Sequence, residues 1–593
     1  FIFMKFNKKI KALPFLFAQI LSLVILSLEV CSQEIKLTVF IESLNGAKKT
    51  IQKQYNNAGE PDKYINRELN TMLAKLWGEG FIEARTDSLV KKDLNYNAYI
   101  NKGSAYELEN IEFGKDIYDI AQARFGSSKQ FKNKIFNYEK ISAFAENLLT
   151  YCENTGYPFA KVKLDSFIII NNKVKILLNI DKGDFFRIDT LLYQPANKIP
   201  YNYINTIIGI KQGTAYCEND LRKIALRINN IDFIECKASP DLKFYEEKTK
   251  LLIRVERRQS NSMEAMLGLL SDNSAGNKIV LSGDLKIKLT NAFGKAELIN
   301  FEWSSPGRQS QNLNTQLRYP CLLNTPFGAD YKFDLLKKDS SFIKVIHNIG
   351  IIYSLKGNKE IKAFYQNLIS NNFINNKSPA LLNQLSDYAN SRAGIYGLEF
   401  YLQNIDYIFN PTKGFALNLS FGAGNKTISK NSGLTEDIYK ELNKNKSLLK
   451  TKLHSDIYFN IYSKNVVMLS FKQELIQSQT LFKNDLFLFG GLKTLRGFDE
   501  DFLNASSYNI LSAEYRFLPD RNTYISIFTD VCYYEKKINK TYFSDTPFGF
   551  GAGITFLTRA GVFSFNYALG KQKNMSPKLN NAKIHFGYIS RFK

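Results

Sequence analysis

Histidine and cysteine are the residue types of this chain that most often carry nucleophilic or metal chemistry. The three histidines, His347, His454 and His585, lie far apart, and the six cysteines form no C-x-x-C pair, so we expect neither a histidine-dependent triad nor a zinc site. Cys217 and Cys236 could pair in an oxidising compartment, although isolated buried thiols are the commoner outcome. The sequence also lacks the G-x-x-x-x-G-K-S/T phosphate loop, the H-E-x-x-H pair and the G-x-S-x-G elbow. We therefore predict a protein that is not an enzyme and holds no cofactor or metal.

The N-terminal residues have the composition of an export signal. A cluster of lysines precedes an apolar run over residues 13–28, which is shorter than the roughly 20 residues that a membrane-spanning helix needs. We expect a cleaved signal peptide over residues 4–32. A lipoprotein anchored through Cys31 is the alternative, although Glu29 stands where a small uncharged residue is wanted.

The formal charge of +23 bears on the choice of partner. Proteins that bind nucleic acid gather Lys and Arg in a patch or stripe, because clustered cations neutralise phosphates and release counterions. In this chain the lysines are spread among Asn, Ile, Phe and Tyr over the whole length. We therefore expect no nucleic-acid partner, and an attraction to anionic lipid head groups stays open.

Residues 33–258 repeat one pattern about every 75 residues: a strand, a helical region, a Gly-aromatic turn and two alternating strands. We place three modules, at residues 33–104, 105–183 and 184–258. The middle copy has apolar residues at helical spacing (Ile141, Phe144, Ala145, Leu148, Cys152), the turn Gly156-Tyr157-Pro158 and an alternating strand (Val174, Ile176, Leu178, Ile180). The helices of the other two copies show the same spacing (Leu69, Met72, Leu73 and Leu76; Leu221, Ile224, Ala225 and Ile228).

Each module is thus predicted to be a small α+β unit in which one helix face covers one sheet face. Such a sheet has open edges, whose unpaired N–H and C=O groups can accept an extended peptide as an added strand. Modules of this kind are suited to gripping unfolded chains. The alternative, that they are spacers that position other proteins, stays open.

From residue 259 to the end the helical periodicity gives way to short segments in which apolar and polar residues alternate. Ile457, Phe459 and Ile461 face one way while the residues between them face the other, and Ile525 and Ile527 do the same in a later segment. This alternation suits a barrel with lipid outside and water inside, although a soluble β-sandwich also alternates. The length is enough for about sixteen strands of roughly 9–11 residues with their connections.

The segment Gly490-Gly491-Leu492-Lys493-Thr494-Leu495-Arg496-Gly497-Phe498 resembles the conserved loop motif of the BamA/TamA superfamily of outer-membrane assembly and translocation proteins. Four further stretches resemble other motifs of the same family: Ser512 to Phe517, Phe528 to Cys532 with Cys532 in place of the usual Gly, Gly549 to Gly553, and Asp406 to Gly414. The stretch Gly156-Tyr157-Pro158-Phe159-Ala160-Lys161-Val162 is similar to the signature of POTRA modules, which the family carries before its barrel.

The resemblance implies α+β periplasmic POTRA repeats at residues 33–258, followed by an all-β transmembrane barrel of about sixteen antiparallel strands at residues 259–593. It places the protein in the cell outer membrane, with its N-terminal modules in the periplasm. The implied partners are unfolded outer-membrane protein clients, the lipid bilayer and accessory lipoproteins. Three modules are similar in number to TamA-type members.

The resemblance also implies that the motif Leu495-Arg496-Gly497-Phe498 lies on a loop folded into the barrel lumen. A guanidinium between low-dielectric walls requires a carboxylate partner, because an unpaired buried charge is costly. Glu514 and Asp530 are at lumen-facing parity, and Phe528 lies on the same face as Asp530, where it can stack on the cation. We expect these three residues to lock the loop through Arg496.

The resemblance further implies that the first and last barrel strands meet at a seam that opens for client strands. We place this seam between Met263 and Leu267 on the first strand and Phe586, Tyr588 and Phe592 on the last. The predicted function is insertion or translocation of outer-membrane proteins. Two alternatives remain: a dedicated two-partner-type secretion pore, and a passive outer-membrane channel or receptor.

Overall fold

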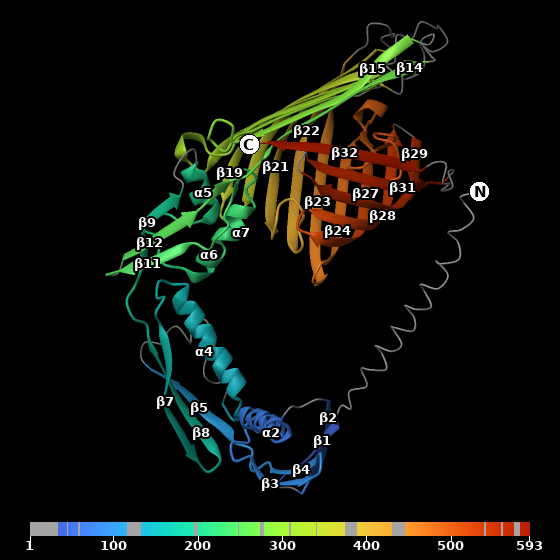
Figure 1. The fold of residues 1–593 in the computed structure, drawn as a ribbon. Coiled ribbons are helices and arrows are strands. Elements are labelled where there is room, and N and C mark those ends of the chain that lie inside the picture. Colours follow the sequence, from blue (N-terminus) through green and yellow to red (C-terminus); the bar gives the residue numbers. More distant parts are fainter. Residues whose placement is uncertain are drawn as a thin grey trace, which may run out of the picture. The chain divides into compact units, whose positions relative to one another are not determined.

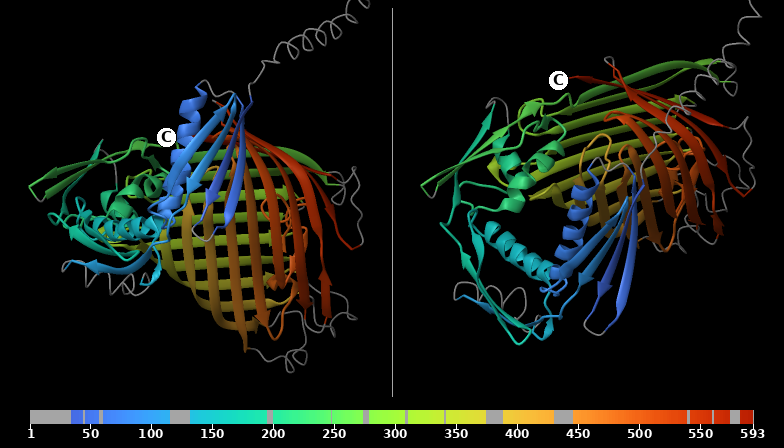
Figure 2. Two further views of the ribbon diagram at one scale, coloured as in Figure 1. Left: turned by 90° about the horizontal axis from the view of Figure 1, so that it is seen from below. Right: turned by 60° about the horizontal axis from the view of Figure 1, so that its bottom comes forward.

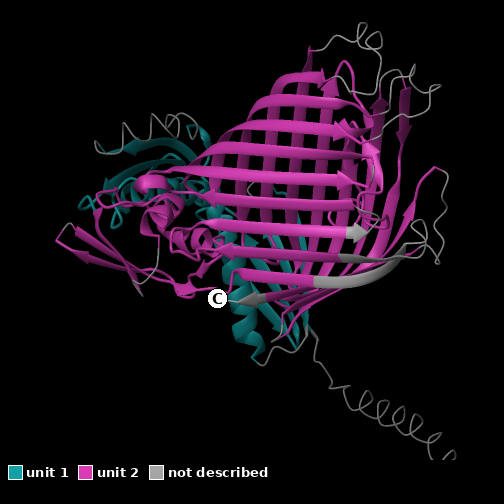
Figure 3. Ribbon diagram, turned by 90° about the horizontal axis from the view of Figure 1, so that it is seen from above, with its two compact units in different colours: residues 1–186 teal, residues 187–593 magenta. Residues whose placement is uncertain are grey.

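The computed structural model describes residues 34–592, apart from 44–45, 57–59, 115–131, 195–199, 247, 273–277, 308–309, 340, 374–387, 430–444, 539–540, 559–560 and 574–581. The expected signal peptide therefore lies outside the described residues. The chain forms two compact units, residues 1–186 and 187–593 (Figure 3).

The first module is a four-stranded sheet covered by one long helix. The sheet has the order β2-β1-β4-β3, from β1 (Glu34–Glu42), β2 (Lys48–Asn56), β3 (Arg85–Lys92) and β4 (Asn95–Asn101), and the helix is α2 (Pro61–Gly78). Leu69, Leu73 and Leu76 are buried against the sheet, as their spacing predicts, and Met72 packs at the margin of this core. The hairpin strand β2 is an addition that the repeat pattern does not show.

The second module follows the predicted pattern closely. Its sheet has the order β6-β5-β8-β7, from β5 (Glu107–Phe113), β6 (Lys134–Ile135), β7 (Lys161–Ile170) and β8 (Lys173–Asp181), under the helix α4 (Tyr138–Glu153). Asn137 begins this helix by accepting a hydrogen bond from the Lys140 backbone N–H at 2.9 Å. The predicted helix and strand faces are confirmed, since Ile141, Phe144, Leu148, Cys152, Val174, Ile176, Leu178 and Ile180 are all buried in one core.

Gly156 shows why the turn after α4 requires glycine. Its φ is +108°, and a Cβ at this position would lie 2.2 Å from the ring of Phe185. The Gly-aromatic turn therefore brings the end of the helix into close contact with Phe185, at the start of the next segment.

The third module belongs to the same compact unit as the barrel. It consists of the sheet β11-β12-β9, a pair of short strands and three helices: β9 (Arg187–Gln194), α5 (Tyr201–Ile208), α6 (Glu218–Arg222), α7 (Ile224–Asn229), β10 (Ile234–Glu235), β11 (Asp241–Tyr245), β12 (Lys248–Arg254) and β13 (Glu256–Arg257). Ile224 and Ile228 are buried as predicted, whereas Leu221 and Ala225 are only partly buried. The exact boundaries of the three modules remain a prediction.

Hydrogen bonds and ion pairs fix the third module to turns at one end of the barrel. Asn230 Nδ2 donates to the Ile405 backbone oxygen at 2.8 Å, and the Gly357 backbone N–H donates to the Ile207 oxygen at 2.8 Å. Lys356 Nζ lies 2.5 Å from an Asp220 oxygen. Because these contacts come from both helices and turns, the third module and the barrel form one body.

The barrel closes from seventeen strand segments (Figures 1 and 2). β29 and β30 pair with successive parts of β28 and together make one interrupted strand, so the barrel has sixteen antiparallel strands. The segments are β14 (Asn261–Asp272), β15 (Lys278–Thr290), β16 (Leu298–Gly307), β17 (Ser310–Tyr319), β18 (Phe327–Lys338), β19 (Phe342–Leu355), β20 (Lys359–Asn372), β21 (Asn390–Ile405), β22 (Gly414–Ser429), β23 (Asn445–Tyr462), β24 (Asn465–Ser478), β27 (Ser507–Asp520), β28 (Thr523–Ile538), β29 (Thr541–Asp545), β30 (Phe548–Leu557), β31 (Val562–Lys571) and β32 (Lys583–Phe592).

The two faces of the barrel wall differ in polarity as the alternation predicts. On β28, Ile525 and Ile527 are exposed on the outer face, while Ser526, Phe528 and Asp530 are buried on the inner face. An apolar outer face is what the lipid interior requires, since polar groups in hydrocarbon lose their hydrogen bonds to water. Among the described helices, none combines the length and the hydropathy that crossing a membrane would take.

Candidate functional site

The segment between β24 and β27 folds back into the barrel and forms an apolar core with its inner wall. It contains the short helix η5 (Lys483–Asp485) and the two-stranded sheet of β25 (Phe487–Phe489) and β26 (Leu503–Ala505). We call residues 479–506 the lumen loop. Leu495 and Phe498 from the predicted motif are buried in this core, together with Cys532 of β28. The thiol that replaces the family's usual glycine thus fills space beneath the loop.

The tip of the lumen loop lies directly on the backbone of β30 and β31. Gly497 has φ +92°, and a Cβ there would lie 2.6 Å from the Leu569 carbonyl carbon. A Cβ on Gly549 would lie 1.9 Å from the Arg496 backbone oxygen. Glycine on both sides of this contact therefore allows the loop to approach the wall closely enough for Arg496 to reach its partners.

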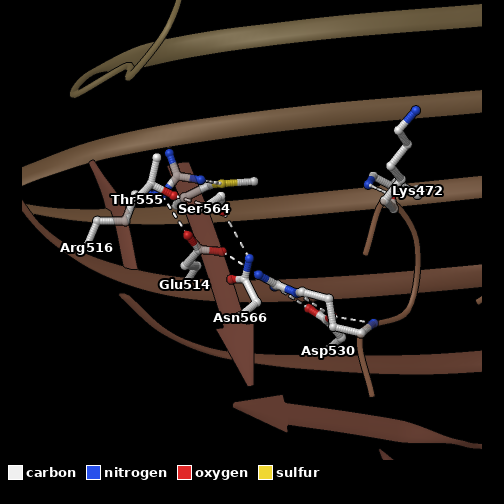
Figure 4. A network of polar contacts seen from close by, with 10 residues as sticks. Lys472, Glu514, Arg516, Asp530, Thr555, Ser564 and Asn566 are labelled. Atoms are coloured by element: carbon white, nitrogen blue, oxygen red, sulfur yellow. Dashed lines mark hydrogen bonds and ion pairs between the residues drawn. The ribbon is translucent and has the colours of Figure 1, made fainter. Parts of the chain in front are cut away.

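Arg496 binds two carboxylates and one aromatic ring of the barrel wall. The two carboxylates, Glu514 and Asp530, are labelled in Figure 4. Its Nε and Nη2 donate to the two oxygens of Asp530 at 2.8 and 2.6 Å, and its Nη1 donates to Glu514 at 2.5 Å. Its backbone N–H also donates to Asp530, at 3.1 Å. The guanidinium carbon lies 3.6 Å from the centre of the Phe528 ring, within the range of a cation–π contact.

The charges of this cluster balance. Arg516 donates from Nε to the second oxygen of Glu514 at 2.8 Å, so two guanidinium groups face two carboxylates. The side chain of Asp530 is completely buried, and that of Glu514 is only 6% exposed. A buried charge of this kind is tolerated only while it is paired, and removing one partner of a buried pair typically costs about 3–5 kcal/mol. The structure therefore brings the four predicted lock residues together, with Arg516 as a fifth member.

Arg516 and a second anchor of the lumen loop were missed in the sequence. Lys426 of β22 forms an almost fully buried ion pair with Asp485 of η5. Asn484 donates to Ser370 Oγ at 2.7 Å and to the Ala389 backbone oxygen at 2.8 Å. Arg516 could have been found from its position two residues after Glu514 on the same face. No signal in the sequence connects Lys426 with Asp485, because the residues lie on different elements and outside the recognised motifs.

The seam between the first and last strands is short. β14 and β32 pair at three positions, Asn261 with Phe592, Ser262 with Arg591 and Met263 with Ser590. In contrast, β21 and β22 pair at sixteen positions. The side chains of Leu267 and Phe592 lie outside the described residues. Phe586 and Tyr588 pair with β31 and not with β14, and both are exposed on the outer face.

A cavity of about 790 Å³ lies at this seam. Its lining includes Glu264 and Lys286 near the start of the barrel and Phe563, Phe586 and Tyr588 near its end. The seam therefore borders a space that combines charged groups with aromatic rings.

Comparisons with known proteins agree with this architecture. A family model, described as the Omp85 superfamily domain, matches residues 291–592. Among solved structures, CdiB from Escherichia coli matches with 12% identity and a TM-score of 0.50, over 90% of this chain and 98% of that one. CdiB from Acinetobacter baumannii gives 12% identity and a TM-score of 0.49 over the same shares. No curated protein matches the sequence.

BamA from Haemophilus ducreyi lacking POTRA domains 1–3 matches with 13% identity and a TM-score of 0.39, over 82% of this chain and all of that one. At 12% identity the match to CdiB from Escherichia coli shows the fold alone, whereas the family model covers half of the sequence. The predicted resemblance and fold class are confirmed. The chain belongs to the Omp85 superfamily, as an outer-membrane β-barrel that carries POTRA-like modules in the periplasm.

Proposed function

We propose that this protein receives unfolded outer-membrane polypeptides on its periplasmic modules and inserts or translocates them at the seam between β14 and β32. Omp85 proteins assemble or transport proteins in the outer membrane, and the general role follows from membership of the family. The seam mechanism is the finer proposal. The observation that carries it is the pairing of β14 with β32 at three positions. Among the residues that the structure describes, most of β14 has no partner on that side.

An unpaired strand edge next to lipid is a template for an incoming strand. Backbone N–H and C=O groups in hydrocarbon are costly when unsatisfied, so a client strand that pairs with β14 gains hydrogen bonds on entry. Burial of the client's apolar surface in lipid adds to the driving force. No nucleotide is needed for such a step.

The middle module offers the best-suited surface for gripping a client. β7 is the last strand of its sheet, and among the described residues no further strand pairs with its outer edge. Beside three exposed charged residues (Lys161, Lys163 and Asp165), β7 exposes five large apolar side chains (Leu164, Phe167, Ile168, Ile169 and Ile170). An extended apolar segment can add to this edge, with main-chain hydrogen bonds for affinity and apolar contacts for selection.

A disulfide across the seam tests the proposed mechanism. Met263 and Ser590 are register partners, and directly opposed antiparallel residues lie within the Cα separation that a disulfide tolerates. In a background whose native cysteines are replaced by alanine, Met263→Cys with Ser590→Cys should leave the barrel folded and abolish insertion of a test client until a reductant is added. The readout is client assembly in reconstituted vesicles.

The matched control is Leu317→Cys with Tyr331→Cys, a register pair across β17 and β18, away from the seam. This disulfide should not affect insertion. Full activity of the oxidised seam variant would rule out opening at the seam and would favour export of a dedicated partner through the lumen, the alternative function. Steady large currents in planar bilayers together with full client assembly in the absence of the protein would instead favour a passive channel.

Charge on the β7 edge tests the gripping step separately. Ile168→Lys with Ile170→Lys should reduce crosslinking of an unfolded client to the middle module several-fold. The free energy of unfolding should change by no more than about 0.5 kcal/mol for each substitution, because both side chains are exposed. Val90→Lys on β3, an edge strand of the first module, is the control and should leave crosslinking unchanged. Equal crosslinking in all three proteins would show that the β7 edge does not hold the client.

A further inference from the structure

The barrel encloses a second cavity whose lining is strongly basic. This cavity, of about 530 Å³, lies between the lumen loop and the inner wall formed by β17 to β24. Three carboxylates line it: Asp334, Glu399 and Glu474. Six lysines line it as well: Lys332, Lys362, Lys450, Lys452, Lys472 and Lys493. We call this space the basic cavity.

Two of the six lysines are neutralised by the carboxylates. Lys362 Nζ lies 3.0 Å from Asp330 and 2.5 Å from Glu399. Lys452 Nζ lies 3.1 Å from Glu474. These pairs use two of the three lining carboxylates, and Lys493 Nζ lies 3.8 Å from Glu302. Lys332, Lys450 and Lys472 supply the excess of positive charge.

The excess charge is concentrated on side chains that point into the cavity without a carboxylate partner. Within the part of the chain that the structure describes, neither Lys332 nor Lys450 has a carboxylate within 4.0 Å, and Lys450 Nζ meets only the Gln366 side-chain oxygen at 3.4 Å. Lys472 Nζ donates to the backbone oxygen of Lys493 at 2.6 Å. Low-dielectric walls focus the field of such groups and raise the local concentration of anions.

Neutral amide groups complete the lining. Asn348, Gln366, Asn418 and Gln473 lie among the lysines and can donate hydrogen bonds. The buried side-chain oxygen of Asn348 has no hydrogen-bond partner among the described groups. Turning this amide by 180° would direct its NH₂ group to the position of that oxygen, where an anion could accept from it.

We propose that the basic cavity binds a polyvalent anion that carries phosphate groups. Lysine ammonium groups recognise phosphate as point charges, whereas a planar carboxylate is best matched by the fork of an arginine, and no arginine lines this cavity. The volume accommodates more than one phosphate group, in keeping with several unneutralised lysines. The proposal is independent of the seam mechanism, because its ligand is not a polypeptide.

The basic cavity shares lining residues with two other cavities. Lys332, Lys362 and Glu399 also line a cavity of about 370 Å³ next to the third module, on the periplasmic side. Lys493 also lines the cavity at the seam, which borders the lipid. The phosphate groups can therefore come from a soluble anion or from a lipid head group.

Lysine acylation measures occupancy in the unmodified protein. The full chain is placed in nanodiscs of zwitterionic lipid and treated with an amine-acylating reagent, with and without inorganic pyrophosphate, and acylation at each lysine is followed by mass spectrometry. Pyrophosphate at a concentration of about ten times its dissociation constant should slow the acylation of Lys332 and Lys450 about tenfold. Acylation of the exposed Lys243 and Lys250 in the third module should not change.

A second arm replaces part of the zwitterionic lipid with phosphatidic acid and omits pyrophosphate. Protection that appears with pyrophosphate supports a soluble ligand, and protection that appears only with phosphatidic acid supports a head group. Unchanged acylation of Lys332 and Lys450 in both arms would overturn the proposal.

Charge removal tests the assignment to these residues. Lys332→Gln with Lys450→Gln should abolish pyrophosphate protection of Lys472, the neighbouring lysine of the cavity. Lys243→Gln with Lys250→Gln removes the same net charge from the third module and should preserve that protection. Protection of Lys472 that persists in the first variant would overturn the assignment. The acylation experiments use the unmodified chain, so they still test the proposal if a variant fails to fold.

Discussion

Two regions of the barrel differ in how many polar groups they pair. One is the cluster of Arg496 with Asp530 and Glu514, which we call the lumen lock, and the other is the seam between β14 and β32. At the lock, Arg496 makes four hydrogen bonds to Asp530 and Glu514. At the seam, β14 and β32 pair at three positions, although every interior pair of neighbouring strands offers a longer ladder. The difference indicates that the stabilising contacts are concentrated where the loop meets β27 and β28 and are few where the barrel closes.

This distribution has a physical consequence for opening. Segments of a protein open locally with free energies that follow their own contacts, from near zero up to the global stability. The strands from β28 to β32 lie between the lock and the seam. In the proposed mechanism, a firmly held lock gives these strands a fixed boundary on one side, and we expect the wall to separate at the seam.

The largest expected effect is at the lock. Arg496→Ala leaves the buried carboxylates of Asp530 and Glu514 without their common partner and should lower the free energy of unfolding by about 3–5 kcal/mol. Denaturant unfolding in detergent measures this loss. Arg521→Ala, which removes an exposed arginine at a turn, should cost less than about 1 kcal/mol. Equal losses in the two variants would remove the proposed contrast between lock and seam.

The second anchor should matter less than the lock. Lys426→Met removes the ammonium, but Asp485 keeps its hydrogen bond from the Phe482 backbone N–H at 2.8 Å and Asn484 keeps both of its bonds. We expect a loss of about 1–3 kcal/mol. Limited proteolysis should cut the lumen loop near residues 479–486 faster than in the unmodified protein.

A double-mutant cycle sharpens this comparison. If the two anchors hold one rigid loop, the combined loss of Arg496→Ala and Lys426→Met should differ from the sum of the single losses by at least about 0.5 kcal/mol. Additive losses would mean that each anchor holds its own part of the loop.

The smallest effect is expected at the seam. Ser590 pairs only with Met263, so Ser590→Pro removes a single ladder contact and should cost less than about 1 kcal/mol of stability. Ser420→Pro lies inside β22, between Glu399 and Lys452, and should cost about 3 kcal/mol or more. Heat denaturation of both variants in detergent makes the comparison, and similar melting temperatures would contradict a weak seam.

Much of the fold can be read from the sequence because its signals are local. Alternation along β28 separates Ile525 and Ile527 from Asp530, and helical spacing in α4 gathers Ile141 and Leu148 on one face. These patterns depend on residues two to seven positions apart, which the backbone geometry of one strand or helix aligns without help from the rest of the chain. The added hairpin strand β2 was missed because its residues are mostly polar and exposed.

The candidate site also combines features that can be read from the sequence with features that only the tertiary structure shows. The lock was predicted because the motif around Arg496 resembles that of a known family, and the parity of Glu514, Phe528 and Asp530 supports it; both the motif and the parity can be read from the sequence itself. The length of the seam, the pairing of Lys426 with Asp485 and the gathering of lysines in the basic cavity come from the tertiary structure alone. They depend on the register of strands far apart in sequence and on the path of the loop. The free energy that determines this register and this path is shared among many contacts between distant residues.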